Sequence, residues 1–416
     1  MISSYYMFCI YSVTMSHGPY LDRKNIGSVS DNQQKSAYMK WKKAILINLA
    51  VILAIVAGLA VFFTTPFGQP ALKTILLVPE VVPSFPVKPL GWVSKAPAVS
   101  EVNLQVGDKE IKADLYRPKD NKEHPAVIFT LGTIVTRKDP AVTKFAQALA
   151  RTGFVVLLPD LPDFLSGFIW TDSVETLISS VQYLENQEYV VQDRIGLIGF
   201  CVGGSVSILA AEDKTISDKV NFIIAVSPYF DTYTSLKAIF TEQIGEPGNL
   251  RSWQSALVTK ETLARGFIEL VNDQNDREVF RQWFLRRKLF DTPKLELKED
   301  SRKIFDFITN SDYVRYDQFW ENLPQETKAV LLELSPKEKI GNLRANVFIL
   351  NDKKDTLVPS AEGKQLTESL TRDKVNYLEI DSFEHVRPGT KLPRWAATKQ
   401  IYRIFGFIYV FFSKVS

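Results

Sequence analysis

The chain has 416 residues, which is enough for one large domain or two smaller ones. Its apolar fraction of 45% and its charged fraction of 23% are ordinary for a globular protein. The net charge of +3, spread without long runs of one sign, argues against a surface that binds nucleic acid. The two cysteines, Cys9 and Cys201, and three scattered histidines predict no disulfide framework, no metal site and no organic cofactor.

The N-terminal part of the chain is dominated by one apolar run, Ala44 to Phe63, which contains no charged residue. A helix of these 20 residues is about 30 Å long, the thickness of a bilayer core. We predict a transmembrane anchor over residues 44–63. A cleaved signal peptide, with a weak cleavage site at Gly58-Leu59-Ala60, and a buried core helix are the alternatives.

Basic residues are frequent in residues 1–43, before the apolar run. The positive-inside tendency therefore predicts that these residues form a cytoplasmic tail, that the chain crosses a cell membrane once, and that the main domain lies outside. Met15 is an alternative start to Met1.

Beyond the apolar run, the chain divides into a spacer and a two-part core. Seven prolines between residues 64 and 98 predict a semi-rigid spacer that packs in part along the domain. Residues 99–230 alternate strand and helix signals, which predicts a doubly wound, mostly parallel α/β sheet. Two half-buried strands, 102–106 and 111–116, precede short apolar runs typical of parallel strands buried on both faces: Ala126–Thr130, Val155–Pro159, Ile195–Gly199 and Phe222–Val226.

An insertion interrupts this pattern over residues 231–339. Four stretches within it have helical spacing: 253–271, 278–289, 301–309 and 325–334. It separates the strand near Val226 from the next apolar strand, at 346–350, so we predict a helical cap over an active site, with most of its aromatic residues forming its own core. Residues 340–416 complete the sheet, and the apolar run 404–412, too short to span a bilayer, is expected to be a final packed helix.

Gly199-Phe200-Cys201-Val202-Gly203-Gly204 is the most informative motif. It follows an apolar strand and precedes a helix of small residues, so it fits the nucleophile elbow G-x-S-x-G with cysteine in place of serine. An elbow strains the backbone of its central residue and needs glycines on both sides, because the strand and helix approach closely. A cysteine held there, at a helix N-terminus, is a candidate nucleophile.

A nucleophile of this kind needs a base and a group that orients the base. His385 follows the strand-like run 375–380 and is our candidate base. His17 precedes the apolar run, and His124 lies in a charged turn where we expect a solvated side chain. Asp355, in the loop after strand 346–350, is the candidate orienting acid, and Asp352 is the competitor. The chain order Cys201, Asp355, His385 is the order found in α/β-hydrolases.

These residues resemble the dienelactone hydrolase family of the α/β-hydrolase superfamily. The resemblance covers about residues 99–230 and 340–416 and depends on the elbow, on Asp355-Thr356-Leu357-Val358-Pro359 and on His385. It implies that Cys201 is the nucleophile, His385 the base and Asp355 its orienting acid. The chain departs from the family at one position. In the best-known members, a glutamate in the loop after the early strand pairs with the cysteine, whereas here the loop 130–135 contains no carboxylate and the first acid after it is Asp139.

The backbone N–H groups of Val202 and Thr133 are the candidate oxyanion hole, the first because it follows the nucleophile and the second from the early strand-to-helix loop. The sequence therefore predicts a hydrolase that acts on a small-molecule ester, lactone or thioester. An acyltransferase with the same triad and an inactive hydrolase fold used as a binding module remain alternatives. Nothing in the sequence predicts the oligomeric state or the substrate.

Overall fold

The computed structural model describes residues 31–82, 85–245, 248–286, 296–381, 383–384, 387–388 and 394–415. The chain divides into two units, Met1–Phe62 and Phe63–Ser416. In the first unit, helix α1 covers Asp31–Phe62. Its segment Met39–Phe62 is exposed throughout and is the one helix among the described residues that is long and apolar enough to cross a membrane. A signal sequence near the N-terminus meets the same criteria of length and apolar composition, so these criteria do not distinguish the two roles.

The second unit is built on an eight-stranded sheet with the order β1-β2-β4-β3-β5-β6-β9-β10. Strand β2 pairs antiparallel with β1 and with β4, and the remaining pairs are parallel. This arrangement confirms the predicted α/β-hydrolase architecture. The strands are β1 (Ala98–Val106), β2 (Lys109–Arg117), β3 (His124–Thr130), β4 (Val155–Pro159), β5 (Val190–Phe200), β6 (Val220–Val226), β9 (Asn346–Asp352) and β10 (Val375–Ile380).

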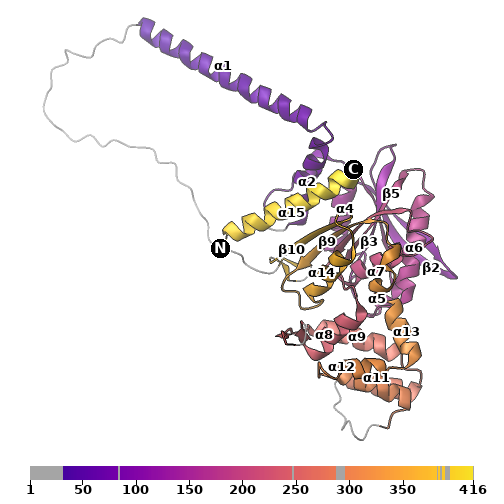
Figure 1. Cartoon of the computed structure of the whole chain (residues 1–416). Coiled ribbons are helices and arrows are strands. Elements are labelled where there is room, and N and C mark those ends of the chain that lie inside the picture. Colours follow the sequence, from indigo (N-terminus) through magenta and orange to yellow (C-terminus); the bar gives the residue numbers. More distant parts are fainter. Residues whose placement is uncertain are drawn as a thin grey trace, which may run out of the picture. The chain divides into compact units, whose positions relative to one another are not determined.

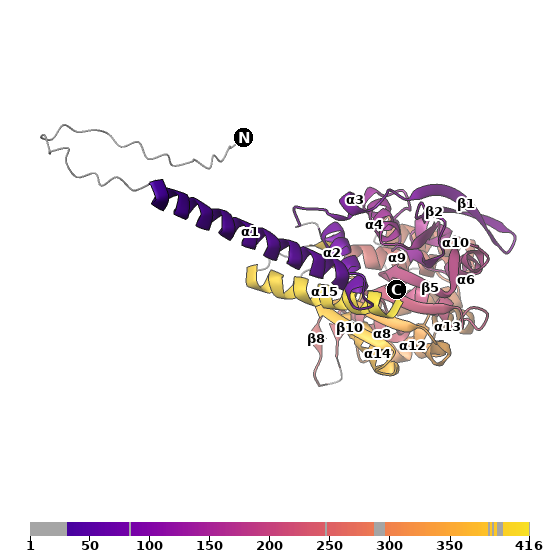
Figure 2. The ribbon, with the colours of Figure 1, turned by 90° about the horizontal axis from the view of Figure 1, so that it is seen from above.

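Helices cover both faces of this sheet, because successive side chains of a strand point to opposite faces. Ala126 and Ile128 of β3 pack with α5 (Pro162–Leu165), α6 (Thr171–Glu185), α7 (Val202–Ala211) and α14 (Ser360–Ser369). Val127 and Phe129 pack in a second core with α2 (Gly68–Val81), α3 (Leu90–Val93), α4 (Pro140–Arg151) and α15 (Arg394–Val415). Seen from above, α15 and β10 lie on one side of this unit and β1 on the other (Figure 2).

The structure differs from the expected spacer over residues 64–98, because α2 forms there in spite of Pro79. Leu77 and Val78 are buried, and α2 lies against α15, whose Phe411 and Phe412 also enter the core (Figure 1). Pro79 stands near the end of the helix, where the loss of one backbone hydrogen bond costs less than this apolar packing contributes. The final apolar run is a packed helix, as predicted.

The insertion forms a helical lobe with its own core, seen at the bottom of Figure 1. The buried aromatic residues of that core include Phe267, Phe280, Phe305, Phe307 and Tyr316, in agreement with the expectation that most aromatics here pack against one another. Its elements are α8 (Thr232–Thr241), β7 (Gln243–Ile244), β8 (Arg251–Ser252), α9 (Leu257–Glu269), α10 (Gln274–Phe280), a π-helical segment (Arg281–Leu285), α11 (Glu299–Thr309), α12 (Tyr316–Glu321), α13 (Gln325–Glu333) and a 3₁₀ segment (Pro336–Asn342).

Candidate active site

Cys201 occupies the sharp turn between β5 and α7. Its φ of 56° lies in the left-handed region, which a residue with a side chain rarely adopts. A Cβ on Gly199 would lie 2.3 Å from the carbonyl oxygen of Gly203, and a Cβ on Gly203 would lie 2.4 Å from that of Leu131. Both glycines are therefore required by close backbone approach. The geometry is that of a nucleophile elbow.

Hydrogen bonds hold this strained turn in place. The Cys201 N–H donates to the carbonyl of Val226 at 2.7 Å, which extends the pairing of β5 with β6. On the other side, the Ser207 hydroxyl donates to the carbonyl of Gly203 at 2.7 Å and lies 2.9 Å from the Thr130 hydroxyl. The end of β3, the turn and the first turn of α7 are thus tied together, so the surrounding fold supports the strain at Cys201.

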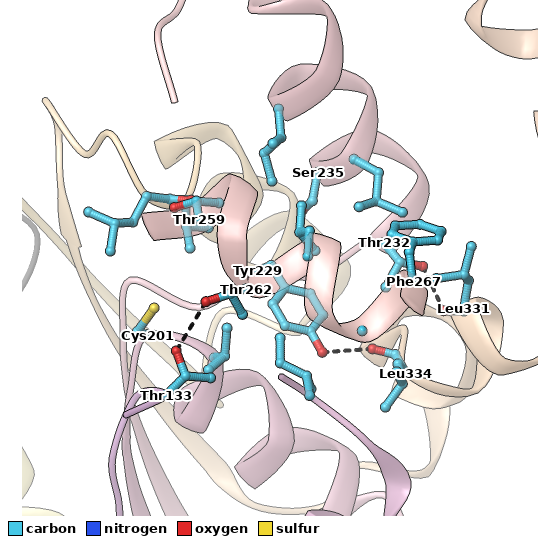
Figure 3. Close-up of a pocket in the computed structure, with 18 of the residues that line it drawn as sticks. Thr133, Cys201, Tyr229, Thr232, Ser235, Thr259, Thr262, Phe267, Leu331 and Leu334 are labelled. Atoms are coloured by element: carbon cyan, nitrogen blue, oxygen red, sulfur yellow. Dashed lines mark hydrogen bonds between the residues drawn. The ribbon is translucent and has the colours of Figure 1, made fainter. Parts of the chain in front are cut away.

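The Cys201 side chain is partly exposed and lines a cavity of about 130 Å³. Residues of α8, α9 and α13, in the helical lobe that we predicted to be a cap, form the opposite wall, so the cavity lies between this lobe and the sheet (Figure 3). Its lining residues are mostly aliphatic or carry hydroxyl groups. They include Thr133, Val202, Tyr229, Ser235, Thr262 and Leu334.

Both candidate oxyanion residues lie beside Cys201. Val202 is the first residue of α7, and the first N–H groups of a helix have no acceptor within it. The loop of Thr133 passes close by, since a Cβ on Gly132 would lie 3.6 Å from the Cys201 Cβ. The Thr133 hydroxyl lies 3.4 Å from that of Thr262, a long contact between the core and cap helix α9 (Figure 3).

Two buried acids stand at the end of β9: Asp352 is the last residue of the strand, and Asp355 lies in the loop after it. Asp355 is 3% exposed, and its Oδ1 accepts the N–H groups of Leu357 at 2.7 Å and Val358 at 3.0 Å. Leu357 and Val358 line the cavity. Asp352 is 2% exposed and accepts the N–H of Lys354 at 2.9 Å. The backbone turn that Asp355 stabilises therefore forms part of the cavity wall.

Of the three histidines, only His124 lies among the described residues. His385 lies outside the described residues, so its contact with Cys201 and Asp355 stays a prediction. His17 also lies outside them. The expectation of a solvated His124 is wrong: it is buried at the start of β3, with Nε2 2.6 Å from Asp120 and Nδ1 3.1 Å from the carbonyl oxygen of Gly153. It stands at the far end of the strand from Thr130, away from Cys201.

Comparison with known protein families adds the family relationship. The model of the X-Pro dipeptidyl-peptidase (S15) family matches residues 107–387, which include the elbow, the helical insertion and every strand of the eight-stranded sheet except β1. The chain belongs to that family. It is a family of serine peptidases, so Cys201 at the elbow is a departure from the family's chemistry. Membership of the dienelactone hydrolase family, another group of α/β-hydrolases, stays a prediction.

Individual relatives are more distant. A Bradyrhizobium protein described as "Probable 2-oxo-3-(5-oxofuran-2-ylidene)propanoate lactonase" is 33% identical over 145 residues, covering 30% of this chain and 56% of the relative. Porphyromonas gingivalis dipeptidyl peptidase 4 is 14% identical with a TM-score of 0.44, covering 75% of this chain and 36% of that one. Pyrococcus horikoshii acylaminoacyl peptidase is 14% identical with a TM-score of 0.45, covering 76% and 41%. The chain thus spans about half or less of the length of these proteins. Its fold is shown by the strand order of the sheet and by the S15 match.

Sequence reasoning missed several residues of this S15 family member. Tyr229, Ser235 and Thr262 line the cavity, but no local pattern distinguishes them from ordinary core or cap residues. Glu212, at the end of α7, is 1% exposed, and neither of its carboxyl oxygens has a hydrogen-bond partner among the described residues. Burial raises the pKa of Glu212 to about 9, so it is a neutral acid at pH 7.

Proposed function

We propose that this chain hydrolyses carboxylic ester, lactone or thioester bonds through a covalent acyl-enzyme on Cys201. The observation that supports this most strongly is the position of Cys201, at a strained elbow that opens into a capped cavity. Strain of this kind persists where the surrounding structure enforces it, and it clusters at active sites. The S15 match supports a hydrolase that forms an acyl-enzyme.

The reaction has two steps. In the first, the Cys201 sulfur attacks the carbonyl carbon, the bond to the leaving group breaks, and His385 passes the thiol proton to that group. In the second, water attacks the acyl-thioester, its proton passes through His385 to the sulfur, and the acid is released. Asp355 orients the imidazole, and the N–H groups of Val202 and Thr133 stabilise the negative charge on the carbonyl oxygen in both steps.

Asp355 is our choice over Asp352 because Leu357 and Val358, whose N–H groups it binds, line the cavity. Two narrower activities have support from relatives. The S15 match favours cleavage of a peptide bond after proline, and the Bradyrhizobium relative favours a lactone.

The test measures turnover of p-nitrophenyl butyrate, a γ-lactone and an alanyl-prolyl p-nitroanilide by the full chain. Cys201→Ala should abolish turnover, and Cys9→Ala, the matched change at the other cysteine, should leave it unchanged. Mass spectrometry after rapid quenching should find the butyryl group on the peptide that contains Cys201. Asp355→Asn should lower kcat more than Asp352→Asn does.

Three outcomes decide between the alternatives. Wild-type turnover by Cys201→Ala would refute the proposal. Transfer of the butyryl group to an added alcohol in preference to water would identify an acyltransferase. A protein that turns over no ester, lactone or anilide, and whose Cys201 fails to react selectively with iodoacetamide, would be a binding module.

We also propose that residues 44–63, which lie almost entirely within the apolar segment Met39–Phe62, anchor the chain in a cell membrane, with residues 1–43 in the cytoplasm and the hydrolase unit outside. The length of this apolar helix and the lysines that precede it support this topology. The mass of the mature protein distinguishes an anchor from a signal peptide, because cleavage near Gly58 would remove the helix. Digestion of the hydrolase unit by protease added to intact cells is the expected result, and its protection would refute the orientation.

A further inference from the structure

The cavity at Cys201 is uncharged along its described lining. None of the described residues that line it is Asp, Glu, Lys, Arg or His. Most of its hydroxyl groups already have a partner in the protein. Tyr229 donates to the carbonyl of Leu334 at 2.9 Å, and Thr232 donates to that of Leu331 at 2.8 Å (Figure 3). The contacts of three others are longer: the hydroxyls of Thr133 and Thr262 lie 3.4 Å apart, and that of Thr259 lies 3.4 Å from the carbonyl oxygen of Leu357. These hydroxyls are satisfied without a ligand, so they present little polar surface to one.

Ser235 differs from these residues. It is buried on α8, lines the cavity, and its hydroxyl oxygen has no hydrogen-bond partner among the described residues. A single neutral hydroxyl can bind one ligand oxygen, but it cannot compensate a buried charge. The cavity therefore favours a neutral ligand.

The shape of the cavity places an acyl chain in it. Figure 3 shows Cys201 and Thr133 at one end, Tyr229 in the middle, and Phe267, Leu331 and Leu334 at the other end. A carbonyl carbon held at Cys201 would thus direct its acyl chain past Tyr229 toward apolar side chains of α9 and the α13 region. The volume of about 130 Å³ is close to that of a dry apolar cavity that holds a six-carbon ring, so it suits about six carbons.

We propose that the site takes neutral esters or thioesters with an apolar acyl chain of up to about six carbons, and that it discriminates against acyl groups that carry a charge. This inference depends on the proposed function. It predicts that the free ammonium group of a dipeptidyl substrate and a carboxylate-bearing lactone both bind poorly, although relatives of this chain are described as acting on such compounds. The physical reason is that a buried charge without a partner costs more than the apolar contacts of a short chain contribute.

The test compares kcat/KM values of the wild-type chain, each divided by the uncatalysed rate of the same ester. Across p-nitrophenyl acetate, butyrate and hexanoate, we expect a rise of about fourfold for each added methylene. The kcat/KM for the p-nitrophenyl ester of levulinate should exceed that for its anionic isostere, the hemisuccinate, by about 100-fold or more. The kcat/KM for the ester of 3,3-dimethylbutyrate should exceed that for its cationic isostere, the betaine ester, by a similar factor.

A cavity variant tests the position of the chain. Ser235→Leu places three carbons where the hydroxyl oxygen stood, so it should lower the ratio of kcat/KM for hexanoate to that for acetate by about tenfold. An unchanged ratio in a folded variant would overturn the placement of the acyl chain. Equal turnover of the charged and neutral isosteres by wild type would overturn the charge discrimination and leave the esterase proposal standing.

A binding readout separates this inference from the proposed function. Hexanamide should protect Cys201 from alkylation by iodoacetamide, whereas 6-aminohexanamide and the monoamide of adipic acid should not. Protection by hexanamide alone, together with no ester turnover, would refute the hydrolase and support the apolar site. Equal protection by all three amides would refute the apolar site.

Discussion

Replacing Glu212 with glutamine should remove a loss of stability that the wild-type protein suffers as the pH rises from 5 to 8. Glu212 is almost fully buried, its carboxyl oxygens have no hydrogen-bond partner among the described residues, and burial raises its pKa from 4.5 to about 9. The unfolded chain releases this proton near pH 4.5, whereas the folded protein keeps it until about pH 9. The contribution to stability is therefore complete below pH 4.5 and is lost as the pH rises toward 9.

The magnitude follows from this difference in pKa. In the window between the two values, the free energy of unfolding falls by about 1.4 kcal/mol for each pH unit. From pH 5 to pH 8 the loss is about 4 kcal/mol, and Glu212→Gln, which has no proton to lose, does not suffer it. For a unit of the size of Phe63–Ser416, this corresponds to a difference in Tm of about 5 °C.

The assay is thermal unfolding of wild type and Glu212→Gln at pH 5, 6, 7 and 8. We expect the Tm of the variant, relative to that of wild type, to rise steadily by about 5 °C over this range. Glu368→Gln, at an exposed position on α14, is the matched control and should follow wild type at each pH. If the Tm values of wild type and Glu212→Gln change in parallel with pH, the reasoning is refuted, because folding then does not change the pKa of this carboxyl group.

Three further changes test the elbow. Gly203→Ala, whose Cβ would lie 2.4 Å from the carbonyl oxygen of Leu131, should destabilise the fold by about 3 kcal/mol or more in thermal unfolding, whereas Gly341→Ala, with nothing within 4 Å, should have little effect. Thr130→Val removes a buried hydroxyl that bridges β3 and α7 and should cost about 1–3 kcal/mol in urea unfolding; an unchanged midpoint would contradict that role. Cys201→Ser should keep measurable esterase activity and lose inactivation by iodoacetamide, and continued inactivation would place the sensitive group elsewhere.

Sequence periodicity and close-packed glycines were enough to predict the sheet and the elbow. Runs such as Val155–Pro159 have the composition of strands buried on both faces, and the structure places this run inside the sheet, between two other strands. The glycines on both sides of Cys201 indicated close backbone approach, which is a local property, and the turn has that geometry. The cap was predicted from an interruption of the alternating pattern, and its described helices form one apolar core.

Burial of individual polar residues and the interior of the active site were decided by tertiary structure alone. His124 and Glu212 stand in segments whose local pattern indicates a surface, yet packing from distant segments encloses both. Helix α2 forms around Pro79 because α15, more than 300 positions later in the chain, covers its apolar face. The cavity joins residues from Thr133 to Pro359, so its uncharged lining is a property of contacts between distant segments, which local periodicity does not encode.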